Sequence, residues 1–228
     1  MEQLLQKTDI FRDFPREVIL RDILPQGQLV EYTKDQWIIE PQQQVDNFSI
    51  LVRGKVNILH LFPDGSFSLM AVLASPEILG SDLICTRSRL SPYHVIAATA
   101  ATLITFPARL ILEPGHMEER WRLEALGNLL TIISHHNMKK EYRLAILSQK
   151  GLRERIATYL LMQSGKRRTN SFRIPFTREE MASFLCVNRS ALSHELSLME
   201  QEGLISFRKN VFTLHHPEKW SAQNTYEL

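Results

Sequence analysis

The stretch of sequence that decides the fold is TREEMASFLCVNRSALSHELSLMEQEG, residues 177–203. It predicts two short helices separated by a tight break. Thr177 and Glu180 form a capping box at the start of the first helix, and Asn188 is a good N-cap for the second. Gly203 is the residue type that most often follows a helix C-terminus. The pattern favours a DNA-binding helix-turn-helix, although an ordinary antiparallel helix pair has the same outline.

Both predicted helices are amphipathic. Their apolar residues recur at spacings of three and four, which places them on one face of each helix. These inward residues are Met181, Ala182, Leu185, Leu192, Leu196 and Met199. The outer face near the start of the second helix carries Arg189, Ser190, Ser193 and His194. A recognition helix enters the DNA major groove by its N-terminal residues, so these four are candidate DNA-binding residues.

Positive charge is concentrated in the half of the chain that contains this stretch. Residues 1–138 have 12 Lys and Arg against 16 Asp and Glu, whereas residues 139–228 have 15 against 9. A basic domain joined to an acidic one is expected of a protein that binds phosphates through one of its domains. A basic surface without a partner is the alternative.

The sequence predicts neither a membrane span nor a secretory signal. No run of about 18 apolar residues occurs, and the N-terminal residues include acids and no apolar segment. Cys85 and Cys186 form no CxxC motif, which fits a reducing compartment and indicates no metal site. We therefore expect a cytoplasmic protein without a structural metal.

Before residue 113 the sequence predicts short helices and then strands. Residues 1–24 have helical periodicity, with anchors at Ile10, Phe11, Phe14, Val18 and Ile19. From residue 27 to about residue 106, turn signals separate runs rich in β-branched and aromatic residues. These runs are QLVEY, QWIIE, FSILVRG, KVNILHLF, FSLMAVL and HVIAATAATLITF. With the hairpin signal Asp64-Gly65, they predict an antiparallel sandwich or barrel of about eight strands.

Residues 117–147 predict one long helix, roughly 40 Å at 1.5 Å per residue. Its seam residues alternate at spacings of three and four, as in a coiled coil. The candidate dimer interface consists of Leu123, Leu126, Leu130, Ile133 and Asn137, and the seam continues through Lys140, Leu144 and Leu147. Leu129 and Ile132 widen the apolar face and are expected to pack on the strand domain. A long helix that packs only on its own domain is the alternative.

The C-terminal segments complete a winged helix-turn-helix. Residues 151–165 predict an amphipathic helix, and the following residues to 176 predict a basic turn and a short strand pair. After residue 203, two strands flank Arg208-Lys209-Asn210. They form a wing whose basic tip includes Lys209 as a candidate phosphate contact.

In this order the pieces resemble the cyclic-AMP receptor protein and fumarate–nitrate regulator (Crp/Fnr) family of bacterial transcription factors, over essentially the whole chain. The landmarks are ILVRGKVNIL, the following hairpin, ILGSDL, LRERIATYLL and the 177–203 stretch. The resemblance implies an α+β fold. An N-terminal antiparallel β-roll of the cyclic-nucleotide-binding type (1–112) is followed by a dimerisation helix (113–147) and a winged helix-turn-helix (148–228). It also implies a homodimer that reads palindromic double-stranded DNA, contacts RNA polymerase and responds to an effector at the β-roll.

The resemblance assigns roles to the DNA-binding residues. Arg189, Ser190, Ser193 and His194 match the positions with which the family reads base edges, whereas Thr177, Arg178 and Asn188 are better placed for phosphates. His194 stands where an arginine is usual, so the half-site is expected to differ. Cys186 replaces the usual turn glycine, so the turn either tolerates a side chain or has an altered geometry.

The turn Gly80-Ser81-Asp82 matches the family's effector-binding position. Members that bind cyclic nucleotides have glycine-glutamate here, and about ten residues later an arginine followed by Ser or Thr and Ala. This chain reads SPYHVIAA at the later position, so we do not expect cyclic AMP. Because residues 1–84 contain no cysteine, an iron–sulfur cluster is not expected either. An unknown small molecule, a protein-only signal or no effector remain open.

The sequence argues against two other functions. A cupin-like metalloenzyme needs clustered ligands, but His60, Glu77 and His94 are scattered and no catalytic motif occurs, so we expect no enzyme. A sensor or interaction module that does not bind DNA is opposed by the basic excess. The sequence leaves open the effector, the operator, the direction of regulation, and whether cysteines or histidines sense redox state or haem.

Overall fold

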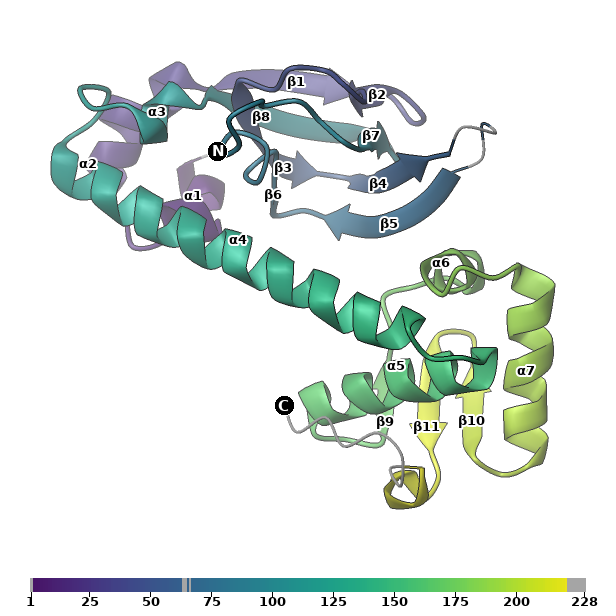
Figure 1. Cartoon of the computed structure of the whole chain (residues 1–228). Helices are drawn as coiled ribbons and strands as arrows, with labels where there is room; N and C mark the ends of the chain where they lie inside the picture. The colour runs from purple at the N-terminus through teal and green to yellow at the C-terminus, as the bar shows by residue number, and fades with distance from the viewer. Residues whose placement is uncertain (1, 63–64, 66, 221–228) are drawn as a thin grey trace. The chain divides into compact units, whose positions relative to one another are not determined.

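The computed structural model describes residues 2–62, 65 and 67–220, and their contacts define two compact units (Figure 1). The first unit ends at Met138 and the second begins at Lys139. Both residues belong to one helix, α4 (Glu119–Leu147). This helix contributes Ile132 to the hydrophobic core of the first unit and Ile146 to that of the second. The boundary between the units therefore falls inside a helix, whereas the boundaries drawn from the sequence follow helix ends.

The first unit contains two antiparallel four-stranded sheets, ordered β1-β8-β3-β6 and β2-β7-β4-β5 (Figure 1). The strands are β1 (Gln28–Tyr32), β2 (Trp37–Ile39), β3 (Asn47–Arg53), β4 (Lys55–Leu61), β5 (Phe67–Ala74), β6 (Glu77–Leu79), β7 (His94–Ala97) and β8 (Ala101–Pro107). Apolar side chains from both sheets, among them Leu51, Val56, Val95 and Leu103, are fully buried in one core. The predicted antiparallel β-roll is confirmed.

The strand pattern differs from the sequence runs in detail. The run HVIAATAATLITF forms two strands, β7 and β8, which lie in different sheets. Residues 77–79, for which no strand was predicted, form β6 and pair with β3. A three-residue strand is too short for alternation to reveal it. In the predicted hairpin, Asp64 lies outside the described residues, but β4 and β5 on either side pair antiparallel.

Short helical segments pack into a further hydrophobic core of the first unit, together with Phe48 of β3 and Phe106 of β8. They are α1 (Glu2–Leu5), α2 (Arg16–Val18), α3 (Arg109–Leu112), two 3₁₀ turns at Asp9–Phe11 and Leu24–Gln26, and a π-helical turn at Ile19–Ile23. The five anchors predicted before residue 24 are all buried in this core, and Leu129 and Ile132 of α4 join them. The prediction that one face of the long helix packs on the strand domain is confirmed.

The second unit is a winged helix-turn-helix. It contains α5 (Leu152–Arg167), β9 (Ser171–Arg173), α6 (Arg178–Phe184), α7 (Arg189–Gln201), β10 (Ile205–Arg208) and β11 (Val211–Leu214). The six inward residues predicted for the two helices are buried in its core. The prediction of a strand pair before residue 177 was wrong, because that segment supplies the single strand β9, which pairs with β11 in the order β10-β11-β9.

Candidate DNA interface

Side-chain caps begin both helices of the helix-turn-helix. The Glu180 amide donates to Thr177 Oγ1 at 3.2 Å, and the Thr177 amide donates to Glu180 Oε2 at 2.7 Å. At the start of α7, the Ala191 amide donates to Asn188 Oδ1 at 2.7 Å. These bonds satisfy amides that a helix leaves without an internal partner, so the caps predicted from the sequence are confirmed. The Thr177 hydroxyl oxygen and the side-chain oxygen Oδ1 of Asn188 are therefore already hydrogen-bonded to amides at the helix starts.

The N-terminal part of α7 presents polar groups away from its buried face. Arg189, Ser190 and His194 are exposed and Ser193 is half-buried, whereas Leu192 on the same helix is fully buried. Arg189 Nη1 lies 3.8 Å from Glu179 Oε2 on α6. The guanidinium is therefore oriented by a neighbour but still open to solvent, which suits a side chain that bonds to a base edge.

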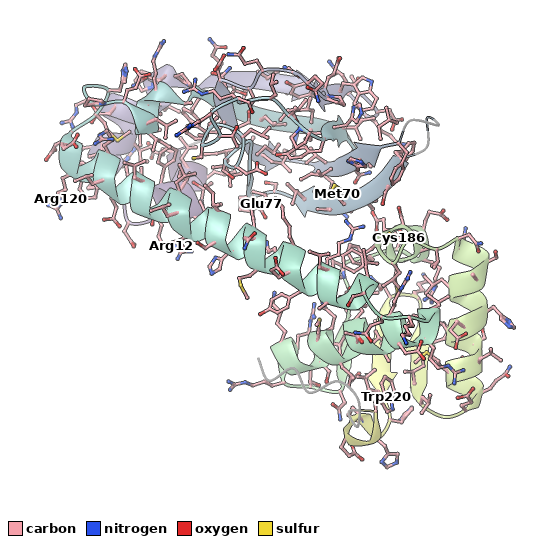
Figure 2. The ribbon with its side chains drawn as sticks, viewed as in Figure 1. Arg12, Met70, Glu77, Arg120, Cys186 and Trp220 are labelled. Atoms are coloured by element: carbon pink, nitrogen blue, oxygen red, sulfur yellow. The ribbon has the colours of Figure 1, made fainter. Side chains whose placement is uncertain are left out.

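Cys186, labelled in Figure 2, lies in the turn between α6 and α7. Its backbone is in the left-handed conformation, with φ of +57°. Its amide donates to Ser183 O at 3.1 Å, so the turn keeps a helix-ending geometry. Two arginines bond to the carbonyls just before it. Arg143 of α4 donates to Phe184 O and Arg155 of α5 donates to Leu185 O, both at 3.3 Å. The usual turn geometry is thus retained here with a side chain in a glycine-type conformation.

Arg178, the first residue of α6, is directed at the wing. Its Cζ atom lies 4.8 Å from the ring centroid of Phe207 and 5.7 Å from that of Phe212, and Nη2 donates to Lys209 O at 3.3 Å. Burial lowers the pKa of Arg178, and the positive charge of Arg189 lowers it further. The side chain therefore connects the helix-turn-helix to the tip of the wing.

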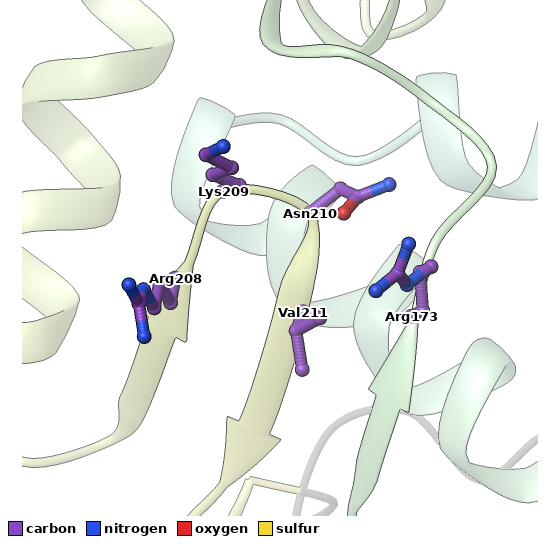
Figure 3. Close-up of a pocket in the computed structure, with 5 residues that line it drawn as sticks. All are labelled: Arg173, Arg208, Lys209, Asn210 and Val211. Atoms are coloured by element: carbon purple, nitrogen blue, oxygen red, sulfur yellow. The ribbon is translucent and has the colours of Figure 1, made fainter.

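Five residues line a pocket of about 430 Å³ at the end of the wing sheet (Figure 3). They are Arg173, Arg208, Lys209, Asn210 and Val211. Lys209 was a candidate from the sequence, but Arg173 and Arg208 were not. Arg173 lies about 35 residues before the wing, and only the pairing of β9 with β11 brings it there. The basic composition of this half was the single signal that could have suggested it.

The candidate effector turn lies in the first unit. Ser81 is buried, and Gly80 has φ of +78° with space so limited that an added Cβ would lie 3.1 Å from Asn47 O. Asp82 Oδ1 accepts a hydrogen bond of 2.7 Å from the Tyr93 hydroxyl. Burial and the Asp82 carboxylate both raise the pKa of Tyr93, so the phenol stays protonated as the donor.

The described residues contain no group of three or more His, Cys, Asp or Glu side chains that could hold a metal ion. Among the helices of residues 2–62, 65 and 67–220, none is long and apolar enough to cross a bilayer.

Two family models match the chain. The Crp-like helix-turn-helix domain matches residues 154–219, and the cyclic nucleotide-binding domain matches residues 29–113. Together they cover more than half of the sequence. No match was found among curated proteins.

Solved structures share the fold. FixK2 from Bradyrhizobium japonicum aligns with a TM-score of 0.61 and 16% identity over 89% of this chain and 99% of its own. CLP from Xanthomonas campestris, a global regulator described as c-di-GMP responsive, aligns with a TM-score of 0.67 and 14% identity over 86% and 97%. A CooA mutant from Carboxydothermus hydrogenoformans aligns with a TM-score of 0.61 and 17% identity over 89% and 92%.

Identities this low show the fold, and the two family models add the arrangement of a cyclic-nucleotide-type domain before a Crp-like helix-turn-helix. These family models rule out both alternatives, the metalloenzyme and the interaction module that does not bind DNA. The chain belongs to the Crp/Fnr family of DNA-binding transcription regulators, whose members are not enzymes.

Proposed function

We propose that this regulator acts as a homodimer joined along α4 and reads a palindromic DNA site with the N-terminal part of α7. The observation that supports dimerisation is the exposed apolar face of α4. Leu123, Leu130 and Leu144 are 56%, 66% and 61% exposed, whereas the neighbouring Leu129 is 2% exposed. An apolar stripe on a helix that already buries another face is typical of an interface between proteins. The proposed seam also includes the exposed Asn137 and two residues, Leu126 and Ile133, that are already partly buried against a core of their own unit.

Base recognition is assigned to Arg189, Ser190, Ser193 and His194. A bidentate bond from Arg189 to guanine would contribute about 1–3 kcal/mol of discrimination. Binding sites selected by the wild-type protein from random duplexes should be palindromic, and Arg189→Ala should lose preference at one base pair in each half-site. Lys166→Ala, an exposed cation in the last turn of α5, is the control and should select the wild-type site. Failure of the wild-type protein to select any sequence would refute the proposal.

The β-roll is proposed to receive a signal other than a cyclic nucleotide. Asp82 faces the Tyr93 hydroxyl, and Arg89 Nη1 is held by Asp46 Oδ1 at 2.8 Å. The later segment SPYHVIAA has no arginine where binding members have one, and Arg89 is engaged by Asp46, so these residues do not fit the phosphate of a cyclic nucleotide. Titration calorimetry with cyclic AMP and cyclic GMP should give no heat of binding. Saturable binding of either nucleotide would overturn this part.

Control of DNA binding is proposed to pass along α4. This helix buries Ile132 in a core of the first unit and Ile146 in the core of the second unit, so a change in the packing of α4 affects both cores. Moving a population from mostly inactive to mostly active takes about 5.5 kcal/mol of differential effector affinity. We further propose that the protein is located in the cytoplasm and that RNA polymerase is its partner. Co-purification with polymerase from a native lysate would test the partner.

A further inference from the structure

Arg153, the second residue of α5, bonds to two carboxylates of α7, the proposed recognition helix. Its Nε donates to Glu195 Oε1 at 2.6 Å, and Nη1 and Nη2 donate to the two carboxylate oxygens of Glu202 at 2.7 and 2.8 Å. Glu195 lies in the middle of α7, and Glu202 is its C-cap. All three nitrogens of one guanidinium therefore bond to the same helix.

The spacing of the two carboxylates attaches α7 at two levels. Glu195 and Glu202 are seven residues apart, which is about two turns of an α-helix and places both on one face. Their attachment points are about 10 Å apart along the helix axis, and their side chains converge on Arg153. The guanidinium is planar and its donors have fixed directions, so this contact resists both a slide of α7 along its axis and a rotation about it.

The ion pairs of this cluster are partly shielded from water. The Glu195 side chain is 19% exposed, and those of Arg153 and Glu202 are 39% and 47% exposed. Hydrogen bonds to Glu202 and Glu195 raise the pKa of Arg153, and the bond from Arg153 lowers the pKa of Glu202. Arg153 and Glu202 are therefore both charged at neutral pH, and their hydrogen bonds are of the stronger, charge-assisted kind.

The buried face of α7 is held in a different way. Leu192, Leu196 and Met199 pack into the core of the second unit. Apolar burial is not directional, so it fixes the depth of the helix more firmly than its rotation. Glu195 directly follows His194, so a rotation of α7 about its axis also turns the base-reading side chains. A binding site needs its groups held within about 0.5 Å and 10–20° of the productive geometry.

We propose that Arg153 is a positioning residue for base recognition, which fixes the rotation of α7 through Glu195 and Glu202. Arg153 contacts no base itself, and the base preference belongs to side chains of α7. This inference rests on the proposed DNA readout and adds the residue of α5 that controls how sharply the sequence is read. Loss of Arg153 should therefore reduce discrimination between sequences more than it reduces DNA binding in general.

The test compares two DNA affinities of the full-length protein. One is for a duplex that the wild-type protein selects from random sequence, the other is for an unrelated duplex of the same length, and their ratio measures specificity. The variant is Arg153→Lys, which keeps the positive charge but lacks the planar fork that bonds to both carboxylates. The control is Arg167→Lys, the same change at the exposed end of α5, where the side chain donates to Gln163 of its own helix.

We expect Arg153→Lys to lower the ratio by about tenfold, the size of one misaligned base contact. The slope of log K against log salt should stay unchanged because no phosphate contact is lost. Arg167→Lys should match the wild type. A smaller fraction of folded protein lowers both affinities by the same factor, so a purely structural role would leave the ratio unchanged. The double variant Glu195→Gln with Glu202→Gln should show the same loss, and adding Arg153→Lys to it should cause no further loss.

An unchanged ratio in Arg153→Lys would overturn the inference, and so would an equal loss in Arg167→Lys. A slope lowered by about 0.9 for each bound protomer would make Arg153 a phosphate contact instead. Additive losses from Arg153→Lys and the double glutamine variant would show that Arg153 acts independently of the two carboxylates, which also contradicts the inference. If the wild-type protein selects no sequence, the proposed readout itself has failed.

Discussion

Replacing Arg178 by leucine separates two roles for this residue, a phosphate contact and a support for the wing. The change removes a guanidinium that lies 4.8 Å from the Phe207 ring centroid and donates to Lys209 O at 3.3 Å. A cation–π contact contributes about 0.5–2 kcal/mol and a net hydrogen bond about 0.5–1.5 kcal/mol. We therefore expect the second unit to lose about 1–3 kcal/mol of stability, since leucine keeps part of the packing on the rings.

Two measurements check this expectation. Urea denaturation gives the loss of stability, and hydrogen exchange at the Lys209 and Asn210 amides shows whether the turn opens more often. In DNA binding, the double variant Arg178→Leu with Lys209→Ala should bind no worse than Lys209→Ala alone, because the support then has no side chain to position. Arg178→Lys should resemble the leucine variant, since lysine lacks the planar fork of the guanidinium.

A different set of results would refute the support role. If Arg178→Leu changes stability by less than about 0.5 kcal/mol, as surface substitutions usually do, the wing does not depend on it. If it also lowers the salt slope by about 0.9 in the Lys209→Ala background, Arg178 is itself a phosphate contact. Retention of affinity by Arg178→Lys would point the same way.

Three further predictions concern other parts of the chain. Cys186→Gly should raise the stability of the second unit by about 0.5–1.5 kcal/mol, because left-handed backbone costs other residues about 1–2 kcal/mol. Cys186→Ala keeps the strain and is the control, so equal denaturation midpoints for both variants would contradict the reasoning. Leu130→Glu should yield a monomer in light scattering. Leu29, which is 53% exposed on β1, provides the control, and Leu29→Glu should remain a dimer. If the Leu130→Glu variant is still a dimer, the dimer interface is not this seam of α4. His94 is buried, neither ring nitrogen has a hydrogen-bond partner among the described residues, and burial lowers its pKa from 6.5. As the pH falls, the unfolded chain therefore binds a proton at His94 before the folded chain does. The free energy of unfolding should decrease as the pH drops below about 6.5, and His94→Phe should reduce that decrease. If His94→Phe leaves the pH dependence of the denaturation curves unchanged, burial of His94 is not its cause.

The sequence by itself determined the local elements of this protein. The caps at Thr177 and Asn188 involve partners three residues away, and the buried faces of α6 and α7 follow from a period of 3.6 residues. Such interactions depend on neighbours in the chain, so one segment contains all the information needed to predict them. The order of these elements was enough to indicate the family.

Tertiary structure alone decided which distant residues meet. Arg173 reaches the wing because β9 pairs with β11, and Arg178 supports Lys209 thirty-one residues later because α6 packs beside the wing. The division of HVIAATAATLITF between two sheets and the unit boundary inside α4 have the same origin. Each depends on the path of the whole chain and on which apolar faces are buried together. A periodic pattern shows that a face is buried, but the partner of that face is set by the packing of the complete core.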